Sequence, residues 1–132
     1  MSIPLICIAL LGFLCIALGF SVSMARTKQK LLFGNSTDPE DVVFQRIRAH
    51  GNTVEYVPIL ALIIYILSQS QQPVWVIWLM VLVTASRYLL AAGLIIPKSM
   101  AEPNAMRFIG SLGTYVFGLG LVAALAMQAM SA

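Results

Sequence analysis

Residues 3–24 read IPLICIALLGFLCIALGFSVSM, an apolar run that contains no charged side chain. A bilayer core requires about 20 consecutive apolar residues in a helix, so this run is long enough to cross it. The run exceeds the roughly 7–15 residues of a signal-peptide core, and its positive charges follow it rather than precede it. We therefore expect a retained transmembrane helix over this stretch.

Three further segments are predicted to span the membrane. Residues 74–96 are interrupted only by Arg87, and residues 107–130 are uncharged beyond the first residue. Residues 48–68 contain a clean apolar run only over 59–67, so this helix has to take polar residues into the membrane. The 132-residue chain is 60% hydrophobic and only 10% charged. These features predict an all-α membrane protein, a single domain (1–132) folded as a four-transmembrane-helix bundle.

The second helix is expected to begin well before its apolar half, near residue 39. Asp38 is a typical N-cap residue, and Pro39 suits the first helical turn. Pro58 is expected to bend the helix, because its nitrogen cannot donate a backbone hydrogen bond. The remaining chain is predicted to form a polar loop around residues 34–36 and two turns, at 68–73 and 97–104.

Charge is confined to one end of the predicted bundle. All 8 Lys and Arg residues and all 5 acidic residues lie in or beside the first and third loops. Cytoplasmic loops are enriched in Lys and Arg, so we expect this end in the cytoplasm and both termini on the non-cytoplasmic side. The net charge of +3 is small and forms no aromatic-interleaved basic patch, so we expect no nucleic-acid partner.

Two ionisable residues fall well inside predicted spans. Burying Glu55 or Arg87 in a membrane costs about 2.5–3.5 kcal/mol each on the insertion scale. Such residues usually face the bundle interior and find partners there. One interpretation is an ion pair between the two that only holds helices together. The other is a functional site.

The spacing of polar residues favours a site. Arg48, Asn52, Glu55 and Tyr56 lie at positions i, i+4, i+7 and i+8, which share one face of a helix. Other candidates at the same end of the bundle are Arg26, Arg46, His50, Arg87, Tyr88 and Arg107. Guanidinium groups bind carboxylates bidentately, so these residues predict a pocket for a small anionic ligand. His50 is the only histidine, so we expect no metal site and no histidine-based triad.

Residues 44–58, FQRIRAHGNTVEYVP, resemble the signature of the MAPEG superfamily. This superfamily comprises membrane-associated proteins of eicosanoid and glutathione metabolism and includes the microsomal glutathione transferases. The pattern Arg-Ala-x-x-Asn-x-x-Glu-x-x-Pro matches at Arg48, Ala49, Asn52, Glu55 and Pro58. At the level of architecture the resemblance covers the whole chain.

The resemblance implies a homotrimer that uses glutathione as co-substrate, bound between neighbouring subunits near the cytoplasmic face. The glutathione-binding residues that it implies are Arg26, Arg48, His50, Asn52, Glu55, Tyr56, Arg87 and Tyr88. Within this set, Arg26 reaches the glutathione of its own or an adjacent subunit, and His50 touches the ligand of the neighbour. Arg107 is implied to be catalytic, because a guanidinium beside the sulfur stabilises the nucleophilic thiolate.

The implied activity is glutathione conjugation or peroxidase chemistry on a lipophilic small molecule that arrives through the bilayer. Ala92 stands where eicosanoid synthases carry a second tyrosine, so a leukotriene-type substrate is not expected. The His-Gly-Asn form of the motif resembles bacterial members, which implies the inner membrane of a bacterium, with the active site facing the cytoplasm. A non-catalytic lipid-binding or scaffolding protein of the same fold is the alternative. A small four-helix exporter is disfavoured, because the first span lacks a carboxylate.

Overall fold

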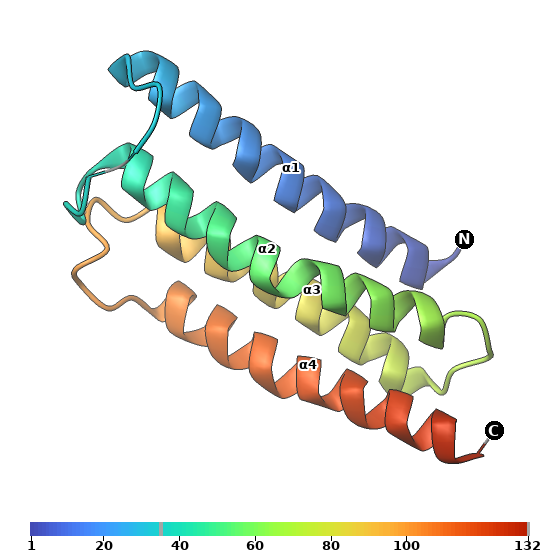
Figure 1. Cartoon of the computed structure of the whole chain (residues 1–132). Coiled ribbons are helices and arrows are strands. Elements are labelled where there is room, and N and C mark those ends of the chain that lie inside the picture. Colours follow the sequence, from blue (N-terminus) through green and yellow to red (C-terminus); the bar gives the residue numbers. More distant parts are fainter. Residues whose placement is uncertain (35, 132) are drawn as a thin grey trace.

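The computed structural model describes residues 1–34 and 36–131, which form an antiparallel bundle of four α-helices (Figure 1). The helices are α1 (Ile3–Gln29), α2 (Val42–Leu67), α3 (Val74–Ile95) and α4 (Ala105–Ser131). Each is long and apolar enough to cross a membrane, which confirms the predicted all-α four-helix membrane fold. Asn35, in the predicted first loop, and Ala132, in the predicted domain, lie outside the described residues.

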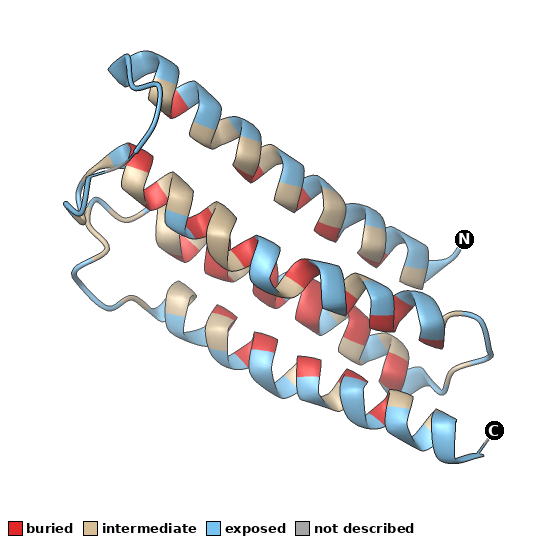
Figure 2. Cartoon of the chain, viewed as in Figure 1, coloured by how far each residue is buried: buried red, intermediate tan, exposed pale blue. Residues whose placement is uncertain are grey.

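The outer surface of the bundle is apolar along much of its length. Phe13, Ile16 and Phe20 of α1 are 67, 75 and 66% exposed, and Leu119 of α4 is 69% exposed. Figure 2 shows buried residues on the inward faces of the helices and exposed residues on the outward faces. In water such a surface would be strongly unfavourable, so lipid is the medium that suits these outward faces.

Two apolar clusters hold the helices together. The larger runs from the middle of the bundle to the end that carries the 68–73 turn and includes Leu11, Ile64, Met80 and Leu121, all completely buried. The smaller, nearer the charged end, joins α1, α2 and α3. In the described residues α1 contacts α2 and α3 but not α4. One side of α1 and one side of α4 are therefore left without a partner from the same chain.

Helices α3 and α4 approach each other closely at glycines near the charged end. A Cβ atom added at Gly93 would lie 2.5 Å from the backbone nitrogen of Arg107. A Cβ atom at Gly110 would overlap the backbone of Leu90 in the same way. Small residues at such positions let helix backbones approach within the membrane. This contact sets the position at which α4 begins beside α3.

The start of α2 differs from the sequence-based prediction. The helix begins at Val42, and its N-cap is Asp41, whose side chain accepts a hydrogen bond from the Phe44 backbone nitrogen at 2.8 Å. Asp38, the predicted cap, instead accepts from the Glu40 nitrogen at 2.9 Å within a turn. The Pro39 carbonyl accepts from the Met100 nitrogen, which ties this turn to the α3–α4 loop and keeps it out of the helix. Helix α2 then continues through Pro58 without interruption.

A buried glutamine links the two loops at the charged end. The side chain of Gln45 is 5% exposed, and its Nε2 lies 3.2, 3.3 and 3.1 Å from the carbonyl oxygens of Pro39, Pro97 and Lys98. An amide donor that satisfies carbonyl groups of separate loops fixes their relative position. Gln45 therefore shapes the end of the bundle at which the charged residues lie.

Candidate functional site

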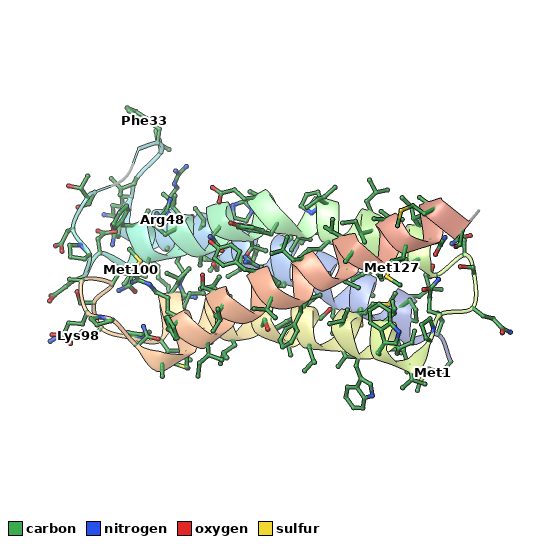
Figure 3. All side chains as sticks on the ribbon, turned by 90° about the horizontal axis from the view of Figure 1, so that it is seen from below. Met1, Phe33, Arg48, Lys98, Met100 and Met127 are labelled. Atoms are coloured by element: carbon green, nitrogen blue, oxygen red, sulfur yellow. The ribbon has the colours of Figure 1, made fainter. Side chains whose placement is uncertain are left out.

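A groove opens between α2, α3 and α4 at the charged end of the bundle. It has a volume of about 550 Å³. Its lining residues are Pro39, Phe44, Arg48, Asn52, Leu90, Leu94, Met100, Pro103, Asn104, Arg107, Phe108 and Ser111. Figure 3 shows Arg48 and Met100 at the same end of the molecule as Lys98, far from Met1 and Met127. The groove falls in the range of about 300–1,000 Å³ that is typical of small-molecule sites.

Arg107 is held at the mouth of this groove by the first turn of α4. The Asn104 Oδ1 accepts a hydrogen bond from the Arg107 backbone nitrogen at 2.8 Å, as N-cap side chains do. The Asn104 Nδ2 donates to the Gly93 carbonyl at 2.9 Å, which ties the start of α4 to α3. The Arg107 guanidinium donates through Nη1 to the Met100 carbonyl at 2.9 Å. These bonds leave the other guanidinium nitrogens for a ligand in the groove.

Arg87 lies behind the groove rather than in it. Its side chain is only 1% exposed, and its Nη2 donates to the Asn52 carbonyl at 3.0 Å and to the Asn52 Oδ1 at 2.8 Å. A weaker contact reaches the Thr53 hydroxyl at 3.4 Å. Because Arg87 engages the oxygen of the Asn52 amide, the Nδ2 group is the part of that amide that Asn52 can offer to a ligand.

The hydrogen-bond partners of Arg87 are not those of the predicted ion pair with Glu55. Arg87 bonds to Asn52 and Thr53 and stacks 5.0 Å from the centre of the Tyr56 ring. Its Nε and Nη1 atoms are buried and have no hydrogen-bond partner among the described residues. Glu55, by contrast, is exposed on the outer surface of the chain, so the prediction that it faces the bundle interior is wrong. The three polar groups Asn52, Thr53 and Tyr56 occupy the place beside Arg87 because they lie on the inward-turned part of the α2 face.

Tyr56 meets a tyrosine of α4 that the sequence analysis did not single out. The Tyr56 hydroxyl donates to the Tyr115 hydroxyl at 3.4 Å, and the two rings form an edge-to-face pair with centres 6.1 Å apart. Arg107, Ser111 and Tyr115 follow one another at four-residue spacing and so share one face of α4. That spacing is a signal in the sequence from which Ser111 and Tyr115 could have been found.

The remaining predicted site residues lie on a different side of the chain. His50 packs against α1, since a Cβ atom at Gly19 would be 3.2 Å from its Nε2. Tyr88 donates its hydroxyl proton to the Leu10 carbonyl of α1 at 2.7 Å. Arg26 closes α1 and donates to the Gly34 carbonyl at 3.3 Å. None of the three is among the residues that line the groove of the same chain.

The fold and the groove together define a class of protein, a four-helix membrane protein with a basic, amide-bearing groove at one end. The family model of the MAPEG family matches residues 4–127. The chain therefore belongs to the MAPEG family, which confirms the resemblance seen in the sequence. No curated protein and no solved structure matches it. Family membership supports a membrane protein related to glutathione and eicosanoid metabolism.

Proposed function

We propose that this protein binds glutathione in the groove between α2, α3 and α4 and activates its thiol for attack on a lipophilic electrophile. The observation that carries the proposal is the meeting of Arg48, Asn52 and Arg107 on one groove, since these residues come from two different helices. Glutathione carries two carboxylates, an ammonium group and a thiol. Two guanidinium groups and an amide suit the carboxylates and the thiolate.

The chemical roles follow from the residue types. Arg48 and the Asn52 Nδ2 bind a carboxylate, and Glu55, exposed three residues after Asn52 on α2, accepts the ammonium group. Arg107 lies beside the sulfur, where its charge favours the thiolate over the thiol. The thiolate attacks the electrophilic carbon and a carbon–sulfur bond forms, while the thiol proton has already passed to water. The leaving group departs with the bonding electron pair, so neither partner is oxidised.

The separation of the predicted site residues onto two sides of the chain supports a cyclic assembly. Arg48, Asn52 and Arg107 line the groove, whereas Arg26 and His50 lie on the α1 side. If the α1 side of one copy covers the groove of the next, all five residues share one site. Contacts between unlike faces form a ring when the rotation from one copy to the next closes. We propose a ring of three copies, with Arg26 and His50 supplied by the neighbouring subunit and Tyr88 deeper along α1, at Leu10.

In this proposal the lipophilic electrophile reaches the groove from the bilayer. The lining of the groove includes Phe108 and Ser111 of α4, and exposed apolar residues such as Val116 and Leu119 follow farther along the same helix. A lipophilic electrophile can enter from that side while glutathione enters from water. We place the groove on the cytoplasmic side of the membrane, because Lys and Arg concentrate at this end of the bundle. That this membrane is a bacterial inner membrane rests on the resemblance of the His-Gly-Asn motif to bacterial members.

Ligand-dependent stabilisation of the purified protein in detergent tests the binding step. A ligand that binds only the folded state stabilises it by about 2.7 kcal/mol at a hundredfold excess over its Kd. We expect glutathione to raise Tm saturably and Arg48→Ala to abolish the rise. Arg46→Ala is the matched control, since Arg46 lies two residues away on α2 but outside the groove. A folded protein that glutathione does not stabilise would refute the proposal.

A non-catalytic scaffold is the second candidate, and one observation favours it. The Arg107 guanidinium already has a structural use, because it bonds to the Met100 carbonyl. The two functions differ in what Arg107→Ala does to conjugation of a benzyl halide with glutathione. Thiolate activation by Arg107 predicts a loss of conjugation rate with glutathione binding largely retained. If the protein is a scaffold, the conjugation rate with the wild type equals that of the uncatalysed reaction, and the rate with Arg107→Ala is the same.

A further inference from the structure

A short apolar segment after α1 is exposed although it lies outside the membrane-spanning helices. Leu31, Leu32 and Phe33 follow the end of α1, and their exposed fractions are 38, 93 and 84%. Two adjacent large apolar residues with this exposure are costly in water. Nothing in the rest of the described chain covers them, so their partner lies outside the chain.

The backbone holds this segment in a defined shape. Lys30 adopts a left-handed conformation with φ 57°, and the Leu31 nitrogen donates to the Arg26 carbonyl at 2.9 Å. The Arg26 guanidinium donates to the Gly34 carbonyl at 3.3 Å, just beyond Phe33. The turn that carries Leu32 and Phe33 is therefore anchored to the last turn of α1 at both of its ends.

The direction in which residues 31–33 point indicates whether their side chains meet lipid or water. Figure 3 shows Phe33 projecting sideways from the bundle, whereas Lys98 lies at the very end of it. A side chain that leaves the bundle sideways meets the surrounding bilayer surface, while one at the end meets water. The segment leaves the outer helix α1, which has no contact with α4 in the described residues (Figure 1).

Charge identifies the kind of lipid. Lys28 and Lys30 are exposed at the end of α1, directly before Leu31, and the sequence has no Asp or Glu before Asp38. Arg26 is held by the Gly34 carbonyl, so the two lysines are the cations free to reach outward. Exposed apolar side chains next to basic residues are the pattern that binds the headgroup boundary of anionic membranes.

We propose that Leu32 and Phe33 insert into the headgroup region of the leaflet at the charged end of the bundle. Lys28 and Lys30 bind the phosphates of anionic lipids there. The segment is thus a lipid-binding element separate from the groove, and it anchors the α1–α2 loop to the membrane surface. The proposal does not depend on glutathione binding.

Fluorescence of a tryptophan placed at the tip tests this. Phe33→Trp is made in a Trp75→Phe and Trp78→Phe background, in which the new side chain is the sole tryptophan of the chain. The protein is reconstituted into phosphatidylcholine vesicles with increasing phosphatidylglycerol. We expect lipids brominated near the headgroup to quench the emission more strongly than lipids brominated near the chain end, and phosphatidylglycerol to increase this quenching. Circular dichroism confirms that the variants keep their helices.

Lysine substitutions test the role of charge. Lys28→Gln and Lys30→Gln should each raise the phosphatidylglycerol fraction that gives half-maximal quenching, by about fivefold per lysine. Lys98→Gln is the matched control, because it removes the same charge from the end of the bundle and should leave this fraction unchanged. Quenching by aqueous iodide instead of brominated lipid would overturn the proposal. Protection from both quenchers would also overturn it, since it would mean that a second copy of the chain covers Phe33.

Discussion

Gly93→Ala tests how closely α3 and α4 approach beside the groove. The added Cβ would lie 2.5 Å from the Arg107 nitrogen and 2.8 Å from its Cα, whereas ordinary contact begins at 3.4 Å. The atoms in the way belong to the backbone, so no side-chain rotation relieves the overlap. Overpacking of this kind costs about 1–3 kcal/mol, and the intrinsic helix preference for Ala returns only about 0.5–1 kcal/mol. We expect Gly93→Ala to be less stable than the wild type by about 1 kcal/mol.

The matched control is Gly12→Ala, since a Cβ at Gly12 meets nothing within 4 Å. That variant should gain about 0.5–1 kcal/mol from helix propensity alone. Reversible unfolding of both variants in mixed micelles, followed by circular dichroism, measures the difference. If the two variants unfold at the same denaturant concentration as the wild type, α3 and α4 do not pack as described.

The same contact should affect function through Arg107. Moving the start of α4 away from α3 lengthens the hydrogen bond between Asn104 and the Gly93 carbonyl, which is 2.9 Å in the native chain. Asn104→Ala removes this bond and the cap on the Arg107 nitrogen without adding bulk. We expect a loss of about 1–2 kcal/mol of stability. Both variants should then conjugate a benzyl halide with glutathione more slowly than the wild type, and an unchanged rate would mean that Arg107 is positioned by other contacts.

Three further substitutions test single contacts. Arg87→Met should weaken glutathione binding about tenfold, because it releases the Asn52 amide. The double variant Arg87→Met, Asn52→Ala should bind glutathione no more weakly than Asn52→Ala alone. Additive losses in this double-mutant cycle would refute the coupling between Arg87 and Asn52. Gln45→Ala should cost about 1–3 kcal/mol in unfolding, because it removes the donor that the Pro97 and Lys98 carbonyls share, and should speed proteolysis of the 97–104 loop. Tyr115→Phe should change stability by less than about 1 kcal/mol, since its hydroxyl contact with Tyr56 is exposed; a larger loss would show that the pair is buried by another subunit.

The residue at which α2 begins could not be predicted from the sequence alone. Asp38 and Asp41 are both good N-cap residues in sequence, and the helix begins after the second one. What decides between them is the hydrogen bond from the Met100 nitrogen to the Pro39 carbonyl, a contact with a distant loop. Helix boundaries that depend on such contacts cannot be predicted from local preferences.

In the candidate site, the sequence alone does not tell whether Glu55 or Arg87 is the buried side chain. Both are ionisable residues inside predicted spans, and the sequence alone treats them alike. In the structure Arg87 is enclosed against Asn52, while Glu55 lies on the outer surface. The rotation of α2 about its own axis decides which of its polar residues turn inward, and that rotation is set by packing against three other helices.

The amino-acid sequence by itself determined the four membrane helices, the charged end of the bundle and the polar face of α2. These features follow from local composition and helical period, because a helix in lipid satisfies its own backbone. Only the tertiary structure decided that Arg48 and Arg107 share a groove, that Arg26 and His50 face away from it, and that Ser111 lines it. The physical reason is that the relative rotation and depth of helices depend on close contacts such as Gly93 against Arg107, which join residues far apart in the chain.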